Sequence, residues 1–169
     1  MKTIEIKLYK FSELSDEAKE KAINDWLSNG IDSQWYESIY EDAKNAGLEI
    51  NSLDIDRASY CKGEFINSAE ETAKLILSSH GEMCETFKTA QNFLSEYLPK
   101  KEAFENGNDG FYYKDETDGD EICEDFLNSL LEDYRIILSN EYDYQTSAEQ
   151  ISECLISNDY DFTENGEMY

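Results

Sequence analysis

The carboxylates of this chain constrain its folding more than any other feature. The 169 residues include 39 Asp and Glu against 14 Lys and Arg, which gives a net charge of −25. Repulsion among so many like charges opposes a compact state unless the carboxylates point into water or face a cationic partner. The charge is also uneven, because residues 115–169 contain 17 acids and a single base, Arg135. The C-terminal third is therefore the acidic pole of the protein.

Hydrophobic content shows that the chain folds despite this charge. Hydrophobic residues make up 40% of the sequence and aromatic residues 13%, whereas disordered acidic chains lack such an aromatic load. A chain of this length predicts one compact domain over residues 1–169. An acidic surface repels nucleic acid and anionic membranes and attracts basic proteins, so we expect neither direct nucleic-acid binding nor membrane binding.

The cellular compartment and the redox state of the cysteines are predicted from three missing sequence features: a membrane helix, a signal peptide and a CxxC pair. No apolar run approaches the roughly 18 residues of a membrane helix, and MKTIEIKLYK lacks the apolar stretch of a signal peptide. These features predict a cytoplasmic protein. The four cysteines form no CxxC pair, so we interpret them as reduced, mostly buried thiols and expect no metal and no cofactor.

Apolar periodicity predicts an α+β fold, in which a small, mainly antiparallel sheet is covered by five or six helices. Strands are predicted over 2–9, 48–55 with an irregularity at 51–52, and 59–65, and Asn165-Gly166 predicts a C-terminal β-hairpin. The predicted helices span 16–28, a segment from a cap at Asp32 to Gly47, a segment that begins after Ser68, 85–98, 120–140 and 147–157. Pro99 is expected to end the fourth of these, and a long acidic loop is predicted at about 100–119.

Two residue pairs could carry chemistry. Asp54 and Asp56 are two apart, so on a strand both carboxylates would share one face and could hold a divalent cation for a metal-dependent hydrolase. His80 and Cys84 are four apart, a spacing suited to a metal or to an activated thiol, although Gly81 interrupts a helix there. We interpret the first pair as a solvated strand face and His80 as a loop residue between two helices. Since no P-loop, GxGxxG, GxSxG or HExxH pattern occurs, we predict that the protein is not an enzyme.

The segment DETDGDEICED, residues 115–125, is the strongest candidate binding site, and the alternative is that its acidity only supplies solubility. It holds seven carboxylates and no base, and it overlaps a calcium-loop pattern only poorly, because Lys114 falls where the first ligand is needed. Carboxylates at most positions of a helix or loop approach the linear charge density of duplex DNA. The predicted contact residues are Tyr112, Tyr113, Asp115, Glu116, Asp118, Asp120, Glu121, Glu124 and Asp125, with the tyrosines placed to stack on arginine or to mimic bases.

Four stretches, LYKFSELSDEAKEKAINDW, LDIDRASYCKGEF, HGEMCETFKTAQNFL and NDYDFTENGEMY, resemble small acidic proteins carried by phages and prophages of gut bacteria and firmicutes, some of them labelled antitoxins. By analogy with acidic anti-CRISPR and antirestriction proteins, the resemblance implies an inhibitor that acts in the bacterial host cytoplasm on a basic CRISPR effector or other defence nuclease through a DNA-mimicking face. The alternatives are an antitoxin-like protein that neutralises a basic toxin, and a metal-dependent hydrolase that uses Asp54 and Asp56.

Overall fold

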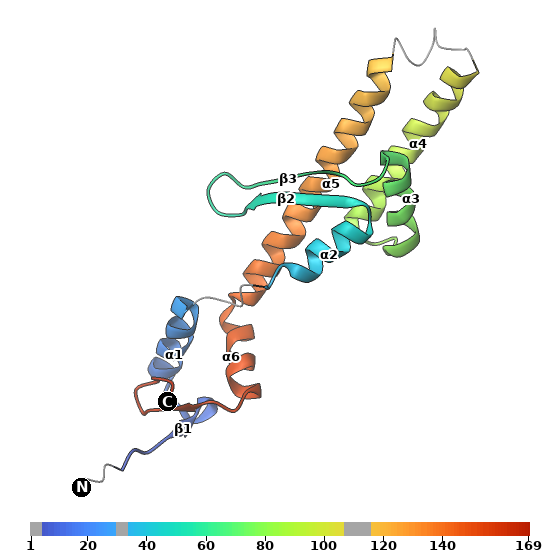
Figure 1. Ribbon diagram of the computed structural model, residues 1–169. Coiled ribbons are helices and arrows are strands. Elements are labelled where there is room, and N and C mark those ends of the chain that lie inside the picture. The colour runs from blue at the N-terminus through green and yellow to red at the C-terminus, as the bar shows by residue number, and fades with distance from the viewer. Residues whose placement is uncertain (1–4, 30–33, 107–115) are drawn as a thin grey trace. The chain divides into compact units, whose positions relative to one another are not determined.

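The computed structural model describes residues 5–29, 34–106 and 116–169, with backbone alone for 116–118. Its helices and strands confirm the α+β class (Figure 1). The chain divides into two compact units: a terminal unit of residues 1–35 and 140–169, and a central unit of residues 36–139. Within the described residues, no helix is both long and apolar enough to cross a membrane.

The described residues of the terminal unit include two complete helices and one short pair of strands. Helices α1 (Asp16–Asn29) and α6 (Ala148–Ser157) pack with a 3-10 turn, η1 (Phe11–Glu13), around a small apolar core. Strand β1 (Tyr9–Lys10) pairs antiparallel with β4 (Asp161–Phe162). The ring of Phe11 meets that of Phe162 edge-on, with centroids 5.9 Å apart. Segments far apart in the sequence thereby share one core.

The C-terminal reversal is a shortened form of the predicted hairpin. Phe162 forms a single antiparallel bridge with Met168, and the Thr163 amide donates to the Glu167 carbonyl at 2.8 Å. Gly166 has φ +82°, and a Cβ there would lie 2.1 Å from the Ala18 carbonyl oxygen. Only glycine therefore allows the turn both its left-handed backbone and its close approach to α1.

The central unit holds a hairpin and four helical segments. In order, these are α2 (Glu37–Asn45), β2 (Leu48–Asp54), β3 (Tyr60–Phe65), α3 (Ala69–Ser79), α4 (Glu85–Glu105) and α5 (Glu116–Gln145), whose last turns belong to the terminal unit. Strands β2 and β3 are antiparallel, and their register shifts between Ile50 and Ser52, where the apolar alternation predicted an irregularity. The hairpin crosses α5 (Figure 1), and Gly63 of β3 lies close to the Leu131 side chain of that helix.

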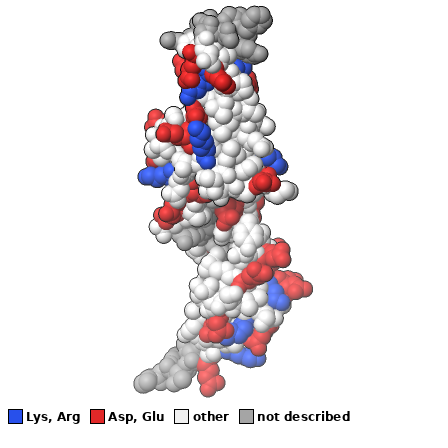
Figure 2. Space-filling view, turned by 90° about the vertical axis from the view of Figure 1, so that its right-hand side faces the viewer, with Lys and Arg blue, Asp and Glu red and all other residues white. Residues whose placement is uncertain are grey.

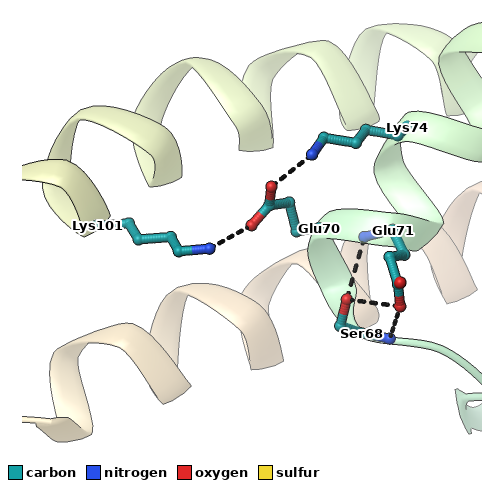
Figure 3. Close-up of polar contacts among 5 residues, drawn as sticks. All are labelled: Ser68, Glu70, Glu71, Lys74 and Lys101. Atoms are coloured by element: carbon teal, nitrogen blue, oxygen red, sulfur yellow. Dashed lines mark hydrogen bonds and ion pairs between the residues drawn. The ribbon is translucent and has the colours of Figure 1, made fainter. Parts of the chain in front are cut away.

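Local capping signals begin α3 and α6 as predicted. Ser68 accepts a hydrogen bond from the Glu71 amide while Glu71 accepts one from the Ser68 amide, which is a complete capping box (Figure 3). Ser147 accepts from the Gln150 amide in the same way. Glu70, the residue before Glu71 in α3, lies between two lysine side chains in Figure 3.

Glu70 links two helices of the central unit. It accepts a hydrogen bond at 2.7 Å from Lys101 of α4 and another from Lys74, one turn further along α3. These bonds, first that of Lys101 and then that of Lys74, lower the pKa of the Glu70 carboxyl. The ionised carboxylate therefore ties α3 to a part of α4 that lies beyond Pro99.

Several of the predicted boundaries were wrong. Residues 2–4 of the predicted strand 2–9 lie outside the described residues. Residues 5–8 form no regular structure, and only Tyr9–Lys10 is a strand, because its partner β4 offers two residues to pair with. The expected single sheet is instead two separate pairs of strands. Pro99 lies inside α4, which continues to Glu105, and α5 already begins at Glu116.

The predicted loop at 100–119 was therefore too long at both ends. Pro99 is exposed, so water can satisfy the carbonyl whose helical donor is missing, and Lys101 holds the following turn through Glu70. Helix α2 begins at Glu37, after the segment that contains Asp32, and the capping role predicted for Asp32 lies outside the described residues.

Candidate protein-binding surface

Helix α5 presents the acidic surface that the sequence predicted. Four of the predicted contact residues are described in full, and all four are exposed: Asp120, Glu121, Glu124 and Asp125. We call these four residues the acidic face. Glu116 and Asp118 belong to the first turn of α5 by their backbone. The predictions for Tyr112, Tyr113 and Asp115 lie outside the described residues.

Helical geometry explains why the acidic face is exposed. Successive residues turn by about 100°, so the four side chains fall within about 140° of the helix circumference. The opposite side of this segment carries Phe126, which is 3% exposed and packs against Phe93 of α4 with ring centroids 4.1 Å apart. Because burial of Phe126 orients the helix, the carboxylates on the other side must face water.

The acidic face lacks the counter-charges that other acids of the chain have. Further along α5, Glu132 pairs with Arg135 at 2.6 Å, and on α4 Glu96 pairs with Lys100 at 2.6 Å. On the side drawn in Figure 2, Lys and Arg side chains likewise lie beside Asp and Glu. Among the described residues, however, no Lys, Arg or His forms an ion pair with any residue of the acidic face.

The helix dipole accounts for only part of this acidity. Negative side chains stabilise the first turn of a helix, where unpaired amides carry partial positive charge, and the effect falls off beyond that turn. Glu116 and Asp118 lie in the first turn of α5, whereas Glu121, Glu124 and Asp125 lie beyond it. These three carboxylates repel one another without stabilising the helix end, so local helix stability does not explain their presence.

Two other ionisable groups of α5 are half-buried and differ from the acidic face. Burial raises the pKa of Asp133, whose carboxylate accepts a 2.7 Å hydrogen bond from Thr89 of α4. Burial, together with the nearby charge of Asp120, raises the pKa of the Cys123 thiol. Asp133 thus joins two helices, and Cys123 is a poor nucleophile at neutral pH.

Asp54 and Asp56, the pair considered for a divalent cation, do not share one face of a strand, because β2 ends at Asp54. Asp54 ends β2, and its Oδ1 accepts hydrogen bonds from the amides of Asp56 at 2.9 Å and Arg57 at 3.1 Å. In a turn of this kind the aspartate side chain accepts hydrogen bonds from the backbone amides that follow it. Across residues 5–29, 34–106 and 116–169, no group of three or more His, Cys, Asp or Glu is arranged to hold a metal ion. The residues of the calcium-loop pattern from 116 onward are helical, which a calcium loop would not allow.

His80 is a packing residue of the central unit. Its Nδ1 lies 2.7 Å from Thr86 Oγ1, its Nε2 lies 3.5 Å from Asp42 Oδ1, and Asp42 Oδ2 accepts a 2.9 Å hydrogen bond from Tyr134. We call these four residues the His80 network. It joins α2, the end of α3, α4 and α5. Cys84 is the exposed residue that precedes α4.

Thr86, His80 and Asp42 follow one another as hydroxyl, imidazole and carboxylate. A catalytic nucleophile, its base and the group that orients the base are arranged in the same order. Thr86 is only 2% exposed, however, so its hydroxyl has no access to a substrate. The network therefore holds helices together. Sequence reasoning placed His80 between two helices but missed Asp42, Thr86 and Tyr134, because the pair Asp42 and Tyr134 is 92 positions apart and no local pattern marks it.

No family model matches this sequence, and no curated protein and no solved structure matches it either. The function is therefore inferred from the chain's own residues.

Proposed function

We propose that the protein is an inhibitor that occupies a basic nucleic-acid-binding surface of a host defence nuclease, of the anti-CRISPR or antirestriction kind, with the acidic face of α5. The observation that carries this proposal is the set of four neighbouring, exposed carboxylates without a basic partner among the described residues. Carboxylates without counter-ions among the described residues are suited to pair with Lys and Arg of another protein.

The spacing of the acidic face matches the charge density of DNA. From Asp120 to Asp125 the axis of α5 rises by about 7.5 Å, at about 1.5 Å per residue. Four carboxylates over that rise give roughly one charge per 2 Å, and duplex DNA presents one per about 1.7 Å of axis. A cleft whose cations fit phosphates could therefore accept this helix face.

The wider composition supports a partner of this class. The concentration of 17 acids against one base in residues 115–169 extends the negative field well beyond the four residues, which speeds encounter with a basic surface. The resemblance to phage-carried acidic proteins favours a defence nuclease of the bacterial host as that partner. Glu116 and Asp118, in the first turn of α5, remain predicted contacts, and so do Tyr112, Tyr113 and Asp115, which lie outside the described residues.

The test is a competition for DNA. A purified CRISPR effector with its guide, and a restriction endonuclease, are each mixed with labelled target DNA, and an electrophoretic mobility shift reports how much DNA stays bound as this protein is added. We expect displacement of DNA from at least one of them at about 50 mM salt and much weaker displacement at about 300 mM, because screening shortens the reach of exposed charges.

A matched pair of variants separates the acidic face from net charge. The first variant converts Asp120, Glu121, Glu124 and Asp125 to their amides. The control converts four other exposed carboxylates to amides and so changes the net charge equally: Glu20, Asp25, Glu41 and Glu153. At about 0.2–1 kcal/mol for each exposed pair, the first variant should need at least about fourfold more protein for the same displacement, and the control little more than the wild type.

Equal displacement by both variants would mean that the acidity acts only through net charge and would contradict the proposal. The absence of displacement from every nuclease, combined with tight binding to a small basic toxin, would favour the antitoxin-like function instead.

A further inference from the structure

A groove beside the acidic face lies between α4 and α5 of the central unit. It has a volume of about 260 Å³ and is lined on one side by residues 89–96 of α4 and on the other by residues 122–129 of α5. Pockets that enclose drug-sized ligands measure about 300–1,000 Å³. This groove is smaller and open, so its size suits one side chain of a partner rather than a cofactor.

The floor of the groove is apolar and consists of stacked aromatic rings. Phe93 and Phe126 stack almost in parallel, with an interplanar angle of 9°, and the stack continues to Phe65 beyond Phe126 and to Tyr97 beyond Phe93. Since the faces of both central rings are covered by other rings, they can turn only their edges toward the groove. Ring edges are the positive part of the quadrupole, so this floor favours methylene groups over a cation.

The rim of the groove carries two carboxylates, one of which is unpaired among the described residues. Asp125 belongs to the acidic face and has no basic partner among the described residues, and Glu96 stands on the opposite side, 2.6 Å from Lys100. Asn92 and Ser129 add neutral polar groups to the same rim. An occupant of this groove therefore needs an apolar stem for the floor and a cationic head, rich in hydrogen-bond donors, for the rim.

We propose that the groove receives an arginine side chain of the basic partner, with its methylenes on Ile122 and the phenylalanine edges and its guanidinium at the carboxylate of Asp125. Arginine fits better than lysine because its planar head offers five donors to several acceptors around the rim. The inference rests on the proposed function and adds to it the residue type that anchors the partner. The acidic face would then steer the encounter, and the groove would fix the register.

The first experiment uses a blocked Gly-Arg-Gly peptide as the probe, titrated into the full-length ¹⁵N-labelled protein. We expect the amide shifts to concentrate at Asn92, Asp125 and Ser129. A Gly-citrulline-Gly peptide, which has the same shape without the charge, should cause no such shifts. Gly-Lys-Gly should bind more weakly. Shifts confined to Asp120, Glu121 and Glu124, or equal shifts with the citrulline peptide, would overturn the inference.

Two variants test the groove itself. Asp125→Asn should weaken arginine-peptide binding about two- to fivefold, the range of an exposed ion pair. Ser129→Phe keeps every charge and fills the groove from an exposed helix position, so it should abolish the localised shifts, while circular dichroism confirms an intact fold. Unchanged peptide binding by Ser129→Phe would refute the groove as the site.

The DNA-competition assay separates failure of the inference from failure of the proposed function. If Ser129→Phe displaces DNA as well as the wild type while the variant of the acidic face does not, the groove is unused and the proposed function stands. If the arginine peptide binds in the groove but no nuclease loses DNA, the groove is an arginine site and the proposed function falls.

Discussion

Removal of one hydroxyl group at the centre of the central unit tests whether the His80 network stabilises the fold. The phenol of Tyr134 is fully buried, and its hydroxyl donates a 2.9 Å hydrogen bond to Asp42 Oδ2. Burial, with the charge of Asp42, raises the pKa of Tyr134, so the hydroxyl stays a neutral donor at all ordinary pH values. Tyr134→Phe deletes this donor and leaves the ring, so it creates no sizeable cavity.

The loss of stability expected for Tyr134→Phe depends on the charge and exposure of the acceptor, Asp42. A hydrogen bond to a charged group contributes about 1.5–3 kcal/mol. The Asp42 side chain is 52% exposed, so water can replace part of the lost bond. His80 also remains 3.5 Å from the other carboxylate oxygen. We therefore expect Tyr134→Phe to lower the free energy of unfolding by about 1–2 kcal/mol.

Urea denaturation at pH 7, followed by circular dichroism, measures this change. Tyr60→Phe is the matched control, because Tyr60 is 37% exposed and its hydroxyl has no hydrogen-bond partner among the described residues. The control should stay within about 0.5 kcal/mol of the wild type. In an Asp42→Ala background, Tyr134→Phe should cost at least about 1 kcal/mol less than in the wild type, since the acceptor is already gone.

An unchanged midpoint for Tyr134→Phe, or the same loss with and without Asp42, would refute this reasoning. The first result would mean that the hydrogen bond only compensates for desolvation of the hydroxyl. The second would place the loss elsewhere than in the bond between these two residues.

Three further changes test other parts of the structure. Because its two lysine partners lower the pKa of Glu70 in the folded state, Glu70→Gln should cost about 0.5–1 kcal/mol at pH 7. Urea titrations should show this difference disappearing as the pH falls through the lowered pKa and the wild-type carboxylate is protonated. Gly63→Ala would place a Cβ 2.2 Å from a carbonyl oxygen of β2 and should cost at least about 2 kcal/mol in the same assay, whereas Gly81→Ala meets no atom within 4 Å and should change little. Burial raises the pKa of Cys61 to about 11, which leaves roughly one Cys61 thiol in a thousand ionised at pH 8. Mass spectrometry after iodoacetamide treatment should therefore find the exposed Cys84 alkylated first. Equal alkylation rates at the two thiols would contradict this.

Features encoded within a few residues were correctly predicted from the sequence. The capping residues Ser68 and Ser147 bond to amides three positions on, so their signal is complete in a short segment. The helix 16–28, the hairpin of β2 and β3 with its irregularity, and the outward side of α5 follow equally from local periodicity. The exposure of the acidic face was predictable for the same reason, since burial of one side of an amphipathic helix determines the other.

Pairing and packing between distant segments were decided only by the tertiary structure. Strand β1 is short because its distant partner β4 offers only two residues, and α4 continues past Pro99, where Lys101 reaches Glu70. The same holds for the groove, whose two sides come from different helices, and for the bond between Asp42 and Tyr134, 92 positions apart. A local pattern specifies which side of an element is apolar, but the neighbour it meets depends on how all the elements pack together, and that is a property of the whole chain.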